Sequence, residues 1–117
     1  MENNIIADKS FLFAIRIVNL QKYLVNQKRE YVLSKQILRC GTSIGANVSE
    51  GIRGQSRADF AAKMAIALKE ASETSFWLKL LCATDYITQE QCDSLLADLS
   101  ELLALLTSIC KTATKAE

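Results

Sequence analysis

Apolar residues recur at steps of three and four from Phe11 to Ala113, which is the spacing that places side chains on one face of an α-helix. The chain has no proline and only four glycines, and no strand-like alternation competes with this pattern. The sequence therefore predicts an all-α protein, an antiparallel up-down four-helix bundle that occupies residues 1–117 as one domain. The helices are expected at about residues 10–27, 31–53, 56–83 and 88–115.

Helix boundaries are marked by capping residues. Gly54 supplies a stop for the second helix, and Ser56-Arg-Ala-Asp59 is a capping-box variant that opens the third. Thr88-Gln-Glu-Gln91 is a fuller capping box at the start of the fourth helix. The connections are therefore short.

The fourth helix has the clearest core seam, at alternating steps of three and four. It consists of Cys92, Leu95, Leu99, Leu102, Leu106, Ile109 and Ala113, widened by Leu96, Leu103 and Cys110. Such a stripe is typical of a helix that packs in a bundle core.

The first helix is apolar on two faces, since eleven of the fifteen residues from Phe11 to Val25 are apolar. One face holds Phe11, Ile15, Val18 and Val25, and the other holds Phe13, Ile17, Leu20 and Leu24. A bundle helix needs one apolar face, so we expect the second, assigned to Phe13, Ile17, Leu20 and Leu24, to contact another copy of the chain. The prediction is a homo-oligomer; the alternative is a monomer with a deeply buried first helix.

Three of the four glycines lie within the second predicted helix, where each costs about 1 kcal/mol relative to alanine. Gly41, Gly45 and Ser49 follow at four-residue spacing and predict a helix-packing groove into which a neighbouring helix fits closely. A phosphate-binding loop is the alternative, but neither GxxxxGK[ST] nor GxGxxG matches the spacing.

Polar stripes run along the second and third helices. They consist of Lys35, Arg39, Ser43, Asn47 and Glu50 on the second helix, and of Asp59, Lys63, Glu70 and Glu73 on the third. A hairpin that pivots near Gly54 places Arg39 near Glu70 and Lys35 near Glu73, which predicts cross-helix ion pairs that fix the register of the two helices. The alternative is a metal or acid–base site at the two glutamates. Ferritin-like sites in bundles use Glu-x-x-His motifs, and this chain has no histidine, so we expect no catalytic residues, no metal and no cofactor.

The cysteines and the N-terminus indicate a location. Met1 to Lys9 has no signal-peptide pattern and no apolar run approaches the ~20 residues of a membrane span, so we expect a cytoplasmic protein without a membrane partner. The cysteines are far apart in the sequence and form no CxxC pair, which favours buried, reduced thiols; they are Cys40, Cys82, Cys92 and Cys110.

Charge is unevenly distributed although the formal net charge is only +1. Residues 28–63 carry seven Lys or Arg against three Asp or Glu, whereas residues 64–117 carry four against eight. Repeated by symmetry, such a block could bind a phosphate backbone. The nucleic-acid-binding candidates, allowing that Lys35 and Arg39 are used internally, are Arg16, Lys22, Lys28, Arg29, Arg53 and Arg57. The alternative is ordinary solvated charge, since no aromatic stacking platform or base-reading motif accompanies the block.

Several segments together resemble a known family. Residues 38–51 (LRCGTSIGANVSEG), Asp59-Phe60, residues 65–74 (AIALKEASET) and Trp77-Leu78 are similar to the four-helix bundle proteins encoded within intervening sequences of bacterial 23S rRNA genes. That family also resembles the accessory proteins of diversity-generating retroelements. The resemblance implies a ring-like oligomer such as a pentamer, a partner RNA or DNA, and no catalytic residues, although this chain is nearly neutral where a retroelement accessory protein is basic.

Three functions therefore compete. The leading one is a non-enzymatic homo-oligomeric bundle that binds RNA or DNA through a symmetric basic surface. The second is a scaffold or adaptor that binds another protein through apolar surface on the first and fourth helices, with no nucleic-acid role. The least favoured is an enzyme or metal carrier that uses Glu50, Glu70 and Glu73.

Overall fold

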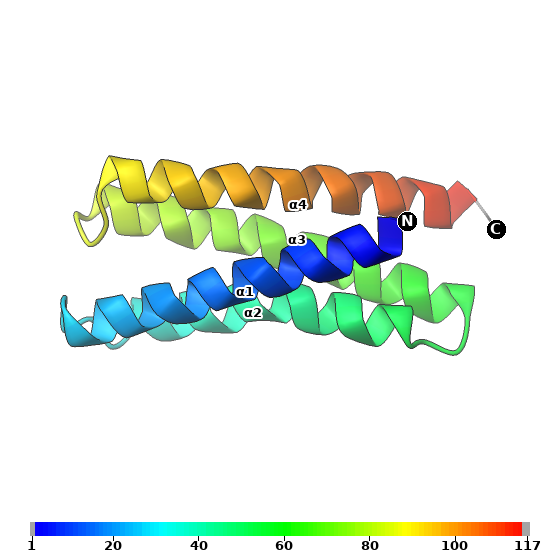
Figure 1. Cartoon of the computed structure of the whole chain (residues 1–117), viewed down its shortest axis with the longest axis horizontal. Helices are drawn as coiled ribbons and strands as arrows, with labels where there is room; N and C mark the ends of the chain where they lie inside the picture. The colour runs from blue at the N-terminus through cyan, green and yellow to red at the C-terminus, as the bar shows by residue number, and fades with distance from the viewer. Residues whose placement is uncertain (1, 116–117) are drawn as a thin grey trace.

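The four predicted helices and the bundle architecture are confirmed (Figure 1). The computed structural model describes the backbone of residues 2–115 and the side chains of residues 5–114. The helices are α1 (Glu2–Asn26), α2 (Leu33–Ile52), α3 (Arg57–Ala83) and α4 (Gln89–Lys115).

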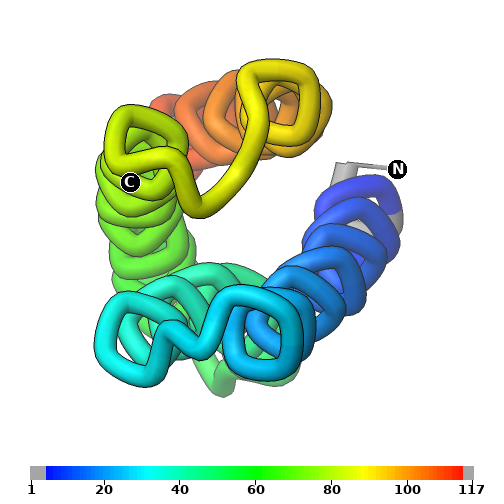
Figure 2. The backbone as a smooth tube through the Cα atoms, turned by 90° about the vertical axis from the view of Figure 1, so that its left-hand side faces the viewer, coloured from blue at the N-terminus to red at the C-terminus, as the bar shows by residue number. Residues whose placement is uncertain are grey.

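Consecutive helices run antiparallel, so the α1–α2 and α3–α4 turns lie at one end of the bundle and the α2–α3 turn lies at the other (Figure 1). Seen along the bundle, the helices stand at four corners, with α1 diagonal to α3 and α2 diagonal to α4 (Figure 2). The bundle measures 47 × 21 × 19 Å. The contact between α1 and α4 is the least extensive of the four.

α1 begins eight residues earlier than predicted. Ser10 has the chemistry of an N-cap, but its hydroxyl instead donates to the Ala7 carbonyl within the helix, at 3.2 Å. Ile6 and Ser10 are buried at 0% and 1% exposure, so the first turns of α1 are held by packing. Burial of Ile6 stabilises these turns despite the polar composition around it.

The core contains the predicted seam of α4, where Cys92, Leu95, Leu99, Leu102, Leu106 and Ile109 are all buried. α3 contributes small and branched side chains to the same core; these are Met64, Ala67, Ala71, Thr74, Leu78 and Leu81. The contact between α2 and α3 is the most extensive in the bundle.

Side-chain caps satisfy the free N–H groups at the starts of three helices. Ser56 Oγ accepts a bond from the Asp59 N–H at 3.1 Å, and Thr88 and Gln91 form the predicted reciprocal capping box. The start of α2 has a cap that sequence reasoning missed, because the buried Glu30 carboxylate accepts bonds from Val32 N and Ser34 N at 3.1 and 2.7 Å. A carboxylate at a helix N-terminus also interacts favourably with the helix dipole.

All four cysteines are free thiols, as expected, but only Cys40 and Cys92 are buried. Cys82 and Cys110 are partly exposed. Among the described residues, no helix combines the length and the apolar character that crossing a membrane requires.

Candidate functional site

The polar stripes of α2 and α3 face each other, and Arg39 is at the centre of their contact. Its guanidinium donates to Glu70 at 3.3 Å and also pairs with Glu73. The predicted Arg39–Glu70 pair is confirmed, whereas the predicted Lys35–Glu73 pair is wrong. Arg39 lies level with the gap between the two glutamates, and its forked guanidinium bridges both, while Lys35 lies one helical turn further on.

The network continues along α2 towards the α2–α3 turn. Ser43 Oγ donates to Glu70 Oε2 at 3.4 Å, and Asn47 Nδ2 donates to Ser43 O and Oγ at 2.8 and 3.0 Å. Nearer the turn, Lys63 Nζ donates to Glu50 Oε1 at 2.8 Å. Among the ion-paired side chains of this network only Glu70 is well covered by protein, at 17% exposure, so the ion pairs contribute register more than stability.

The three carboxylates of this network do not form one cluster. Glu50 pairs with Lys63, whereas Glu70 and Glu73 share the single guanidinium of Arg39. Within the part of the chain that the structure describes, no three Cys, Asp or Glu side chains are grouped so that they could hold a metal ion. These ion pairs fix the register of α2 against α3.

Glu73 has a second partner that ties it to the core. Trp77 Nε1 donates to Glu73 Oε2 at 3.0 Å. This hydrogen bond, aided by the charge of Arg39 and opposed by partial burial, holds the pKa of Glu73 below its ordinary value of 4.5. A carboxyl whose pKa is lowered on folding stabilises the fold above its unfolded-state pKa, and this contribution is lost as pH falls through the folded-state pKa.

Replacing Trp77 by Phe is expected to raise the pKa of Glu73 towards 4.5 and to flatten the acid limb of the stability curve. Carboxyl carbon chemical shifts recorded by NMR during an acid titration report the pKa directly. Glu50, which Trp77 does not contact, is the internal control. An unchanged Glu73 titration would show that the indole hydrogen bond does not set its pKa.

The predicted groove of small residues on α2 receives α1. A Cβ atom on Gly41 would lie 2.7 Å from the Ile17 side chain, and one on Gly45 would lie 3.3 Å from the Ser10 carbonyl oxygen. The helix-packing interpretation is confirmed for these two glycines. The phosphate-loop alternative is wrong, because both glycines lie inside the continuous helix α2.

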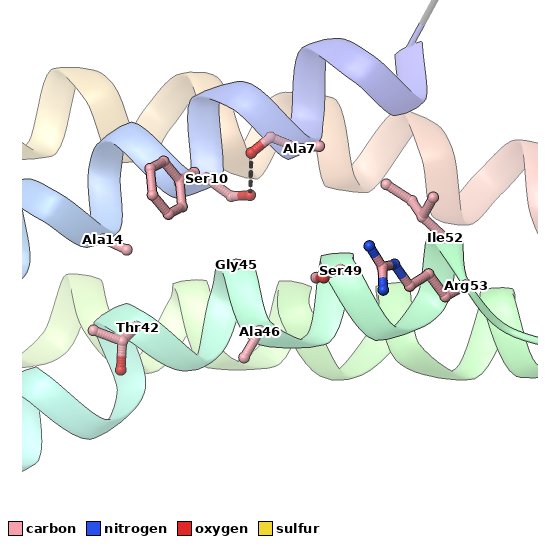
Figure 3. Close-up of a pocket in the computed structure, with 10 residues that line it drawn as sticks. Ala7, Ser10, Ala14, Thr42, Gly45, Ala46, Ser49, Ile52 and Arg53 are labelled. Carbon is pink, nitrogen blue, oxygen red and sulfur yellow. Dashed lines mark hydrogen bonds between the residues drawn. The ribbon is translucent and has the colours of Figure 1, made fainter.

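An open groove of about 430 Å³ lies between α1 and α2 on the outer side of this close contact (Figure 3). Small side chains form its floor; they are Ala7, Ser10 and Ala14 from α1, and Thr42, Gly45, Ala46 and Ser49 from α2. Phe11 also lines it, and Ile52 and Arg53 lie at the end nearest the α1 N-terminus.

The exposed side of α1 is apolar beside this groove. Phe11 and Leu12 are 66% and 61% exposed, and Ile5 and Ile15 are 43% and 44% exposed. We call these four residues the α1 face. Asp8 lies beside the α1 face on the same helix and has no ion-pair partner among the described residues.

The prediction had assigned the wrong side of α1 to an oligomer contact. Phe13, Ile17, Leu20 and Leu24 are buried inside the single chain, at 8% exposure or less. The spacing of four and three that joins them continues back through Ser10 to Ile6, and this longer seam makes them the core side.

α3 has its own exposed apolar side chains, which α1 does not contact. Ile66 is 42% exposed and Phe76 is 58% exposed. Lys69 lies between them on the exposed surface, also without an ion-pair partner among the described residues. We call these three residues the α3 face.

The candidate basic residues are separated. Arg16 is engaged within the chain, since its guanidinium donates to Asp98 at 2.7 Å and to Ser94 Oγ at 2.9 Å. Lys28 and Arg29 lie in the α1–α2 turn, whereas Arg53 and Arg57 lie at the opposite end of α2. Lys22, on α1, is exposed.

Aromatic rings accompany the basic residues of the α1–α2 turn, which sequence reasoning had not anticipated. Lys28 Nζ lies 6.0 Å from the centre of the Tyr23 ring, and Tyr31 is 51% exposed. Arg29 has a left-handed backbone conformation, with φ = 55°, and its side chain is exposed. We call Lys28, Arg29 and Tyr31 the turn cluster.

The fold and these surfaces define a helical bundle with apolar faces on opposite helices and a charged network at a helix pair. The family of 23S rRNA-intervening sequence proteins matches residues 2–108, and the chain belongs to this family. A crystal structure of a protein of unknown function from the S23 ribosomal protein family of Bacteroides thetaiotaomicron VPI-5482 is similar, with 58% sequence identity and a TM-score of 0.93. The likeness covers 95% of this chain and 99% of that one. No curated protein matches the sequence.

Proposed function

We propose that the protein is a non-enzymatic assembly module in which copies of the chain associate through the α1 face. The observation that carries the proposal is the exposure of Ile5, Phe11, Leu12 and Ile15 along one side of α1. Contiguous apolar surface of this kind is typical of an interaction site. The groove between α1 and α2 lies directly beside it and has room for side chains of a partner.

The partner in this proposal is the α3 face of a second copy. Both faces have large apolar side chains, and unpaired charges of opposite sign lie with them: Asp8 beside the α1 face and Lys69 in the α3 face. Because α1 and α3 are diagonal in the bundle, such a contact is head-to-tail. A head-to-tail contact closes into a ring when the rotation between copies permits, and a pentamer is one such ring.

A charge placed in the α1 face tests this assembly. Leu12→Asp is expected to weaken self-association roughly 100-fold, because the contact would bury an unpaired carboxylate next to Asp8. Sedimentation velocity measures the loss, and circular dichroism checks that the helices persist. Since Leu12 is 61% exposed, the fold of one chain does not depend on it.

Ser108→Asp is the matched control, because Ser108 is an exposed position of α4 outside both faces. If both variants kept the wild-type mass, the α1 face would not be the contact. If the wild-type chain were itself a monomer, the α1 face would instead serve a different protein, as in a scaffold or adaptor.

We further propose that the assembly binds single-stranded nucleic acid through the turn cluster. Lys28 and Arg29 supply cations that no carboxylate neutralises among the described residues, and Tyr31 supplies an exposed ring. Cationic side chains contact phosphates and aromatic rings stack on bases, which together favour unpaired strands. Acidic side chains on the neighbouring helix, such as Glu90 near Tyr23, limit the size of the basic surface.

Reversing both charges, in Lys28→Glu/Arg29→Glu, is expected to weaken binding of a labelled single-stranded RNA at least about 10-fold at about 50 mM salt. The slope of log affinity against log salt should fall by roughly two, one for each lost phosphate contact. Fluorescence anisotropy measures both, with the DNA strand of the same sequence run in parallel.

Arg53→Glu, at the other end of α2, is the comparison variant and should retain most of the binding. Tyr31→Ala should weaken binding without changing the salt slope, since stacking releases no counterions. Equal losses from Lys28→Glu/Arg29→Glu and Arg53→Glu would contradict the assignment to the turn cluster, and no binding by the wild type would remove the nucleic-acid role.

A further inference from the structure

The α3–α4 hairpin brings together two cysteines that have nine residues between them in the sequence. Cys82 lies near the end of α3 and Cys92 lies in the first turn of α4. Cys92 Sγ donates to the carbonyl of Leu78, at 3.7 Å, and Leu78 is one helical turn before Cys82. The Cys92 thiol therefore lies against the same stretch of α3 that carries the Cys82 thiol.

Both thiols line one small recess at this end of the bundle. The recess has a volume of about 330 Å³, and its lining includes Lys79 and Gln89. Cys82 Sγ donates to Gln89 Oε1 at 3.4 Å. Burial, which raises the pKa of Cys92, outweighs the positive charge of Lys79, which lowers it.

The two thiols differ in exposure. Burial raises the pKa of the Cys92 thiol, and the nearby Cys82 raises it further. Cys92 is 2% exposed, whereas Cys82 is partly exposed. The pair thus consists of an accessible thiol and a covered one, which is the arrangement of an attacking and a resolving cysteine.

We propose that Cys82 and Cys92 form a reversible redox modification site, a dithiol that is converted to an intramolecular disulfide by a low-molecular-weight disulfide such as oxidised glutathione. The site is independent of the proposed assembly, because it includes no residue of the α1 face or of the α3 face. The disulfide would link the end of α3 covalently to the start of α4.

The chemistry proceeds by two thiol–disulfide exchanges. The Cys82 thiolate attacks one sulfur of oxidised glutathione, the glutathione S–S bond breaks, and one glutathione thiolate leaves. The Cys92 thiolate then attacks the Cys82 sulfur of the mixed disulfide and releases the second glutathione. The protein loses two electrons and two protons, and oxidised glutathione is reduced to two molecules of glutathione, which take up both protons.

The other two cysteines are excluded by their positions. Cys40 lies on α2, where its thiol donates to the Ile37 carbonyl within the helix at 3.8 Å. Cys110 lies eighteen residues beyond Cys92 in α4, a separation of about 27 Å along the helix. The hairpin therefore selects one pair among the four cysteines.

The test is to equilibrate the reduced protein with glutathione buffers of increasing oxidised fraction, and then to alkylate the remaining thiols and map them by mass spectrometry. The wild type is expected to pass from four alkylated cysteines to two, with Cys82 joined to Cys92 in a monomeric chain. Added dithiothreitol should restore all four.

Serine variants separate the two roles. Cys92→Ser should retain one glutathione on Cys82, because the resolving thiol is absent, whereas Cys82→Ser should take up none at position 92. Cys110→Ser should behave as the wild type. Four persistent thiols in the wild type, or a disulfide that still forms in Cys82→Ser, would overturn the proposal, as would cross-links between chains in place of the internal bond.

Discussion

A mixture of two assembly-defective variants, Leu12→Asp and Phe76→Asp, is expected to form a particle of two chains, although each variant alone stays a monomer. The first variant lacks a working α1 face and the second lacks a working α3 face. One intact contact remains possible in the mixture, between the α3 face of the first variant and the α1 face of the second. Because that pair has no further intact face to offer, the assembly stops at two.

This experiment separates a head-to-tail contact from a symmetric one. If two α1 faces packed against each other, Phe76→Asp would retain the wild-type mass and the mixture would contain no paired species of the two variants. Native mass spectrometry of variants with distinct isotope labels identifies the composition of each particle. A mixture that contained monomers only would contradict the α1-to-α3 contact.

Gly41→Ala is expected to destabilise the fold, although alanine favours helix over glycine by about 1 kcal/mol. The added Cβ would lie 2.7 Å from the Ile17 side chain, which is fully buried and would have to shift within the core. Overpacking of this kind costs about 1–3 kcal/mol, so after the gain from alanine we expect a net loss of up to about 2 kcal/mol in the free energy of unfolding by urea.

A double-mutant cycle with Ile17→Ala locates the cause. Ile17→Ala alone should cost about 2–5 kcal/mol, and the double variant should cost at least about 1 kcal/mol less than the sum, because each change relieves the other. Gly45→Ala is the milder comparison, since its Cβ would lie 3.3 Å from the Ser10 carbonyl oxygen. Strictly additive costs would show that the close approach of α1 and α2 does not explain the glycine.

The ends of α2, α3 and α4 could be predicted from the sequence to within two residues, because local chemistry determines them. Gly54, Ser56 and the Thr88–Gln91 box stop or start helices through bonds to nearby backbone groups. The start of α1 could not be found in this way. Ile6 holds it by burial against other helices, and no short-range signal reports such a contact.

Which side of α1 is buried was predictable in principle, but only from a longer window. Between Phe11 and Val25 the two apolar sides are equivalent, so the choice between them was arbitrary. One of the two seams continues through Ser10 to Ile6, and this longer seam is the buried side. When the helix is assumed to begin at residue 10, Ile6 is left out of the pattern. The wrong helix start therefore led to the wrong choice of the buried side of α1.

The sequence correctly predicts ion pairs between α2 and α3, but it predicts their partners only to within about one helical turn. A pivot near Gly54 correctly brings Arg39 to Glu70, yet Arg39 also takes Glu73 in place of Lys35. The same symmetry about the α3–α4 turn pairs Cys82 with Cys92, which the absence of a CxxC motif had led us to regard as distant. Arg16 illustrates a different difficulty, because its partner Asp98 lies on α4, far along the chain.

The most direct test of the central claim, that copies of this chain assemble through α1 and α3, is sedimentation equilibrium of the tag-free wild-type protein. The measurement should span a roughly hundredfold range of concentration, so that a fixed assembly is distinguished from a growing one. The account predicts a single closed species whose mass is a fixed multiple of 13.0 kDa. A mass of one chain at every concentration would contradict it.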